Sequence, residues 1–131
     1  MLRVLTVLVA FCATPALATE WEHCANKDGA ASFDYLAGDG VDVLAISAIT
    51  VTAGEKVWAS DPANGPGDPI KVGQAFEDNE AVRIDGVDDS YSVIASLKLF
   101  KATEGDKSAM AGTLTIKDMG AWAVDCDPDA Q

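Results

Sequence analysis

The sequence is short of the residues that usually carry catalysis, with one histidine, His23, and three cysteines among 131 residues. It holds no Cys-x-x-Cys pair and no Cys-x-x-Cys-His, which excludes the thioredoxin-like redox motif and the usual haem attachment motif. A glycine-rich phosphate loop is also absent, which excludes the common nucleotide-binding motifs. No nucleophile elbow accompanies the single histidine, so we expect a protein that is not an enzyme.

Basic residues are scarce, at nine lysines and arginines against 21 aspartates and glutamates, and the formal net charge is −12. Such a surface repels nucleic acid and anionic membrane faces, so neither is expected as a partner. It attracts cationic proteins, cationic peptides and metal ions. The simpler alternative is that the charge serves only solubility.

Long apolar runs are absent except at the start of the chain. Arg3 precedes the uncharged run 4–13, and the small residues Ala16-Leu17-Ala18 follow it. A positive start, a short apolar middle and an A-x-A end are the parts of a secretory signal, and the run is too short to span a bilayer. We therefore predict that residues 1–18 are a cleaved signal peptide. Residues 19–131 would then form a single domain in the periplasm or outside the cell.

Two cysteines, Cys24 and Cys126, remain after that cleavage, near opposite ends of the mature chain. An exported protein with two cysteines favours a disulfide between them. Free thiols or metal ligands are the alternatives, and neither cysteine has a second cysteine or a histidine at metal-ligand spacing. The bond would bring the first and last strands together, either as paired neighbours or across two layers.

Most of the sequence alternates apolar and polar side chains, which is the period of a half-buried β-strand. Residues 91–101 show it best, because one face collects Tyr91, Val93, Ala95, Leu97 and Leu99, with Ile94 and Phe100 as exceptions on the other face. Further strands are predicted over 20–25, 41–52, 56–60, 70–72 and 81–85, with turn-forming clusters such as 103–108 between them. The sequence therefore predicts an all-β fold, a small antiparallel sandwich or flattened barrel closed by a terminal disulfide.

Two segments need separate interpretation. Residues 112–126 predict a hairpin. Leu114 and Ile116 share a face of its first strand, Lys-Asp-Met-Gly forms the turn, and Trp122 and Cys126 share a face of its second strand. Residues 28–38 fit a helix by spacing and a strand by composition, and we favour the strand.

The best candidate for a site is the acidic segment 77–89. Asp85, Asp88 and Asp89 would flank one turn there, and calcium takes six to eight oxygen ligands gathered from loops. The spacing differs from that of the twelve-residue helical calcium loop. The alternative is a solvated acidic loop. Calcium is the one cofactor we consider, and no other cofactor is expected.

In its predicted export, acidity, strand pattern and terminal cysteines the chain resembles the small periplasmic inhibitors of lysozyme. The likeness is architectural, because the Ser-Gly-x-x-Tyr loop of those inhibitors is absent, and no residue role is transferred. The sequence thus predicts a non-enzymatic binding or interaction module that engages a cationic protein. A calcium-binding β module is the alternative. A hydrolase is the third, and a pocket holding His23 with a perturbed carboxylate would favour it.

Overall fold

The computed structural model describes residues 19–38 and 44–126, so the predicted signal peptide, residues 1–18, lies outside the described part. The described residues form ten strands, one short 3-10 helix and no α-helix. Their bounds are β1 (Glu20–Ala25), β2 (Ala31–Gly38), β3 (Ala45–Ala53), β4 (Lys56–Ala59), η1 (Pro62–Asn64), β5 (Asp68–Pro69), β6 (Lys71–Glu77), β7 (Ala81–Val87), β8 (Val93–Glu104), β9 (Lys107–Ile116) and β10 (Gly120–Cys126). No helix in this part of the chain is long and apolar enough to cross a membrane.

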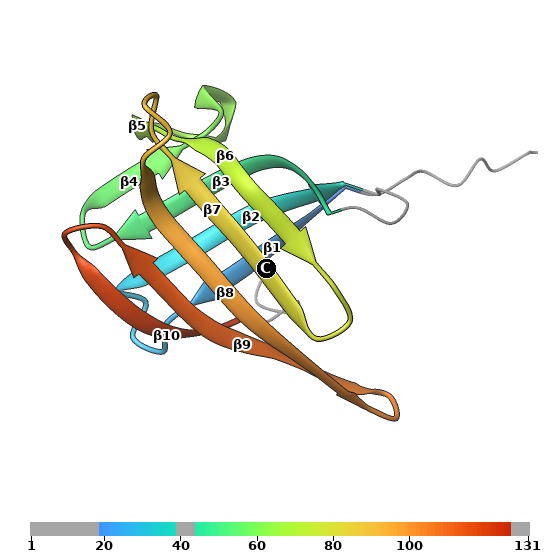
Figure 1. Cartoon of the computed structure of the whole chain (residues 1–131). Helices are drawn as coiled ribbons and strands as arrows, with labels where there is room; N and C mark the ends of the chain where they lie inside the picture. Colours follow the sequence, from blue (N-terminus) through green and yellow to red (C-terminus); the bar gives the residue numbers. More distant parts are fainter. Residues whose placement is uncertain (1–18, 39–43, 127–131) are drawn as a thin grey trace, which may run out of the picture.

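All ten strands belong to one sheet, in the order β5-β4-β3-β2-β1-β10-β9-β8-β7-β6. Every neighbouring pair is antiparallel except β4 and β5. Figure 1 shows the wall formed by β6, β7 and β8 crossing over the wall formed by β1, β2 and β3. Strands β3 and β6 also contact each other, although no ladder joins them. The sheet is therefore a nearly closed, flattened barrel, which confirms the predicted all-β fold.

The predicted disulfide joins Cys24 to Cys126, with the two Cα atoms 4.1 Å apart. The two cysteines lie opposite each other in the register of β1 and β10, so the terminal strands are paired neighbours in one sheet. Both are buried. The bond thus fixes the position at which the two halves of the sheet, β1–β5 and β6–β10, meet.

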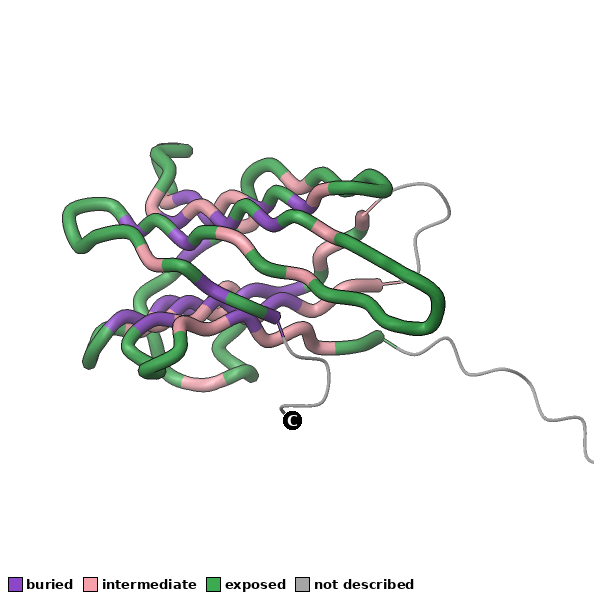
Figure 2. Tube along the Cα trace, turned by 90° about the horizontal axis from the view of Figure 1, so that it is seen from below, coloured by how far each residue is buried: buried purple, intermediate pink, exposed green. Residues whose placement is uncertain are grey.

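The core fills the space between the two walls with alternate side chains from each strand. Figure 2 shows the buried positions along the middle of the strands, whereas residues 102–109 at the tip of the β8–β9 hairpin are exposed. The largest fully buried side chains include Phe33 on β2, Leu97 on β8 and Leu114 on β9. Residues 31–38 form a strand as predicted. The 112–126 hairpin is also confirmed, with Ile116 and Cys126 buried inside the barrel.

Some predicted boundaries were wrong. Strand β8 begins at Val93, because Tyr91 has φ +63° in the preceding turn and is 78% exposed. Strand β6 runs over 71–77, well past the predicted 70–72. The expected loop 103–108 is mostly strand, since pairing continues to Glu104 and Lys107 around a two-residue turn. Here the hairpin projects beyond the barrel, so both of its faces are polar and the period-two pattern is lost.

Candidate functional site

One end of the barrel is open within the described residues because β10 covers only part of the length of β9. Strand β10 stops at Cys126, opposite Cys24, and pairs with β1 at only two positions. Among the described residues, no strand therefore lies between residues 20–23 of β1 and residues 107–110 of β9. Side chains that point inward at this end therefore face an opening, where a neighbouring strand would otherwise pack against them.

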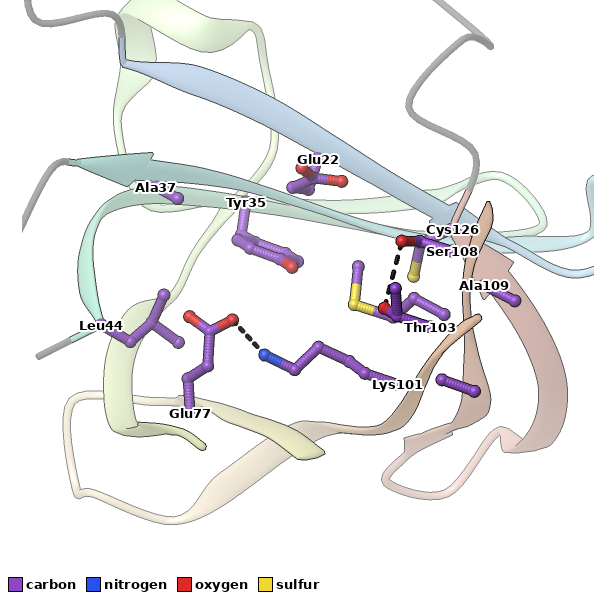
Figure 3. Close-up of a pocket in the computed structure, with 12 residues that line it drawn as sticks. Glu22, Tyr35, Ala37, Leu44, Glu77, Lys101, Thr103, Ser108, Ala109 and Cys126 are labelled. Atoms are coloured by element: carbon purple, nitrogen blue, oxygen red, sulfur yellow. Dashed lines mark hydrogen bonds and ion pairs between the residues drawn. The ribbon is translucent and has the colours of Figure 1, made fainter. Parts of the chain in front are cut away.

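A cavity of about 320 Å³ occupies this end. Its volume lies at the lower limit of ligand pockets, which span roughly 300–1,000 Å³. Apolar side chains line one part of it: Ala37, Leu44, Ala102, Ala109 and Met110. The disulfide, through Cys126, forms part of the wall, and the remaining lining is polar: Glu22, Tyr35, Glu77, Lys101, Thr103 and Ser108. We call this space the end cavity (Figure 3).

Two cross-strand pairs contribute to the wall of the end cavity. Glu22 lies opposite Tyr35 in the register of β1 and β2, and Lys101 lies opposite Met110 in the register of β8 and β9. Glu77 from the end of β6 completes the polar wall. Since directly opposed residues share a sheet face, the alternation of each strand points these side chains inward. The cavity therefore collects side chains from both halves of the sheet, from β1, β2, β6, β8 and β9 (Figure 3).

The Tyr35 side chain is buried, with 3% of the residue exposed, and its hydroxyl points into the end cavity (Figure 3). No hydrogen bond joins that hydroxyl to another group in the described part of the chain. Burial raises the pKa of Tyr35 above its usual range, and the negative charges of Glu22 and Glu77 raise it further. The hydroxyl therefore keeps its proton. Among the described residues no fully buried side-chain nitrogen or oxygen lacks a hydrogen-bond partner, so the Tyr35 hydroxyl is open to the cavity although the rest of the residue is buried. A ligand in the cavity can therefore reach it.

Glu22 is half-buried beside Tyr35 and has no ion-pair or hydrogen-bond partner among the described residues. Burial raises the pKa of its carboxyl group above the ordinary value, and Glu20 and Glu77 add to the increase through charge repulsion. By contrast, Glu77 accepts a hydrogen bond from Lys101 Nζ at 2.7 Å. The end cavity thus holds one satisfied ion pair and one uncompensated carboxylate.

We expect Glu22→Gln to raise the free energy of unfolding at pH 7. A carboxyl group whose folded-state pKa is raised contributes stability below the unfolded pKa and loses it as the pH rises through the folded pKa. The wild type and the variant should therefore become equally stable at pH values below about 4, where the group is protonated in both states. Urea unfolding at a series of pH values measures this difference. Glu104→Gln, which removes a charge from the exposed hairpin tip, is the control, and a Glu22→Gln variant less stable than the wild type at pH 7 would contradict the expectation.

The structure does not gather the predicted calcium ligands into one site. The Asp85 carboxylate accepts from Ser96 Oγ at 2.6 Å, whereas Asp89 pairs with Lys71 Nζ at 2.8 Å. Asp88 accepts hydrogen bonds from Ser90 Oγ and from backbone N–H groups in its own turn, and these bonds lower its pKa. Among the described residues, no three or more histidine, cysteine, aspartate or glutamate side chains form a group that could hold a metal ion. The calcium hypothesis stays a prediction without a cluster to support it.

His23 lies on the outer face of β1, away from the lining of the end cavity. Its Nδ1 meets the carboxylate of Asp34, and Ser32 Oγ donates to the other oxygen of that carboxylate at 3.5 Å. In a serine hydrolase the histidine lies between the serine and the aspartate and takes the serine proton. Here the aspartate lies between the other two, so these three residues do not form that relay.

The residues of the end cavity were missed at the sequence level, although a signal existed. Glu22 lies two positions before the buried Cys24, and Lys101 lies two positions after the buried Leu99. Strand alternation therefore placed both charges on inward-facing positions. A charge at such a position is a sign of either a strand end or a functional cavity.

Comparisons with protein-family models, with curated proteins and with solved structures gave no match for this chain.

Proposed function

We propose that this protein is an exported, non-enzymatic binding module and that the end cavity is its ligand site. The observation that carries the proposal is the hydroxyl of the buried residue Tyr35, which opens onto the cavity and lacks a partner among the described residues. Small-molecule sites are typically concave and apolar, with a few polar groups that fix the orientation of the ligand. The end cavity has that composition, with apolar side chains on one side and Glu22, Tyr35 and the Glu77–Lys101 pair on the other.

Export is part of the proposal. The Cys24–Cys126 disulfide supports it, because such bonds persist mainly in oxidising compartments. The sequence features of residues 1–18 support it as well. A cationic partner, expected from the net charge of −12, fits the uncompensated Glu22 carboxylate at the open end.

A neutral fluorescent probe such as N-phenyl-1-naphthylamine tests whether the end cavity accepts a ligand. We expect its fluorescence to rise on binding to the wild type. Ala37→Trp places a large side chain on an inward-facing position of the lining and should reduce the affinity at least tenfold, because it fills the space that the probe needs.

Thr113→Trp is the matched control for this experiment. Thr113 is exposed on the outer face of β9, so a tryptophan there adds the same side chain without entering the cavity. Both variants should keep the far-UV circular dichroism of the wild type. Equal loss of probe binding in both variants, or no binding to the folded wild type, would contradict the proposed ligand site.

A further inference from the structure

The charges that face the end cavity sum to a negative value. Glu22 and Glu77 line the cavity, and Lys101 is the one basic side chain in its described lining. Glu20, two positions before Glu22 on β1, adds a further negative charge nearby. The Lys101 ammonium is already bonded to Glu77 at 2.7 Å. An anionic ligand would meet the free Glu22 carboxylate with no free cation to balance its own charge. The cavity is therefore electrostatically suited to a cation.

The Tyr35 hydroxyl supplies an independent feature beside that carboxylate. It belongs to a different strand and lies directly across from Glu22 in the register. Because burial keeps the hydroxyl protonated, it is neutral, and its oxygen can accept a hydrogen bond from a ligand while its proton is donated to a carboxylate. A carboxylate and a hydroxyl on adjacent strands can together accept two N–H bonds from one donor.

The apolar part of the lining limits what can be attached to that donor. Leu44 and Ala37 lie on the side of β2 and β3 (Figure 3). Met110 belongs to β9, where it pairs with Lys101. A methionine thioether adapts to flexible chains better than branched side chains do. The volume of about 320 Å³ leaves room for a stem of a few carbon atoms and no more than a small ligand.

We propose that the end cavity binds a primary ammonium group on a short apolar stem, with the ammonium between Glu22 and Tyr35 and the stem against Leu44 and Met110. This inference rests on the proposed function, because it names the ligand of the same cavity. The same chemistry occurs in free alkylamines and in lysine side chains of a cationic protein. The ammonium would supply the partner that both Glu22 and the Tyr35 hydroxyl lack.

Three six-carbon probes test the inference: hexylamine, hexanol and hexanoate, which share a stem and differ in the charge of the head group. Saturation-transfer NMR and competition with N-phenyl-1-naphthylamine give their affinities for the mature protein. We expect hexylamine to bind about tenfold more tightly than hexanol, as a charge-assisted hydrogen bond implies, and hexanoate to bind most weakly. Glu22→Gln should remove the preference for the amine over the alcohol.

Three further variants separate this role from a general effect on folding. Glu104→Gln removes a negative charge from the exposed hairpin tip and should keep the preference for the amine. Tyr35→Phe should weaken the binding of hexylamine several-fold more than that of hexanoate. Lys101→Met removes the basic side chain and frees Glu77, so it should raise the affinity for hexylamine several-fold.

A comparison of Nα-acetyl-lysine methylamide with its norleucine analogue distinguishes the two sources of the ammonium group. Binding of the lysine derivative at the strength of hexylamine would support a protein partner, and binding of hexylamine alone would support a free amine. If hexanol binds as tightly as hexylamine and Glu22→Gln changes neither affinity, the inference is overturned, but the cavity is still a ligand site. If neither the hexyl probes nor the neutral naphthylamine bind, both proposals fail.

Discussion

Replacing Cys24 and Cys126 together with alanine is expected to lower the free energy of unfolding by about 4 kcal/mol. The bond closes a loop with a sequence separation of 102 residues, nearly the whole described chain. In the chain-entropy model, a loop of that size costs the oxidised unfolded state roughly 4 to 5 kcal/mol of conformational entropy. Urea unfolding followed by circular dichroism measures the loss.

The position of the bond in the sheet adds a second consequence. The halves β1–β5 and β6–β10 share only the β1–β10 ladder, and that ladder contains two register pairs, Cys24 with Cys126 and Ala25 with Asp125. Without the bond, the junction should open before the rest of the barrel, and the amide of Ala25 should lose its protection from hydrogen exchange first.

Reduced wild-type protein is the control that separates the cross-link from packing, because it keeps both cysteine side chains. It should unfold at nearly the same urea concentration as the double variant. If the oxidised protein, the reduced protein and the double variant were equally stable, the disulfide would have no role in holding the two halves together.

The interior of the barrel was predictable because burial imposes a period of two on each strand. Leu97 and Leu99 on β8, and Leu114 and Ile116 on β9, are buried on the inward positions that the alternation indicated. The disulfide was predictable for a related reason. The two cysteines that follow the predicted signal peptide have one possible pairing, and the position of Cys126 on the inward face already agreed with burial.

The end cavity could not be predicted in the same way, since it depends on where each strand ends relative to its neighbours in the sheet. Alternation places Glu22 and Lys101 on inward faces, but only the register shows that β10 ends at Cys126 and leaves both side chains beside an opening. The acidic segment 77–89 was misleading for the opposite reason. Its aspartates are close in sequence, whereas Asp85 and Asp89 take partners on different strands, Ser96 on β8 and Lys71 on β6.

The unpaired groups of the end cavity are best understood as a balance between stability and binding. The half-buried Glu22 carboxylate, which has no partner among the described residues, lowers stability in the free protein, and the Tyr35 hydroxyl beside it is open to a partner. A ligand that supplies the missing hydrogen bonds removes that cost and stabilises the folded state by mass action. The groups lie at the short end of β10, while the opposite part of the barrel is packed with Ile84, Leu97 and Ile116. The rigid core thus holds the Glu22–Tyr35 pair in place without the ligand.

Gly112 lies where two strands of this barrel leave no room for a side chain. It sits on β9 in register with Leu99 on β8 and Val124 on β10, at an inward-facing position. A Cβ atom there would overlap the carbonyl oxygen of Lys98 and would lie 2.9 Å from the Cα atom of Leu99. Both are backbone atoms, which cannot turn aside as a side chain can. A glycine inside a strand commonly marks such a close approach.

Gly112→Ala is therefore expected to lower the free energy of unfolding by roughly 3 kcal/mol or more, because β8 and β9 must separate to admit the methyl group. Urea unfolding and the near-ultraviolet circular dichroism of the buried aromatic side chains measure the effect. Gly86→Ala is the matched control: its added Cβ would meet Ile70 Cδ1 at 2.5 Å and Ile49 Cδ1 at 3.1 Å, which are the ends of movable side chains. We expect that variant to lose only about 1 kcal/mol. Equal losses in the two variants, or a Gly112→Ala protein as stable as the wild type, would show that β8 and β9 do not approach each other as closely as the structure indicates.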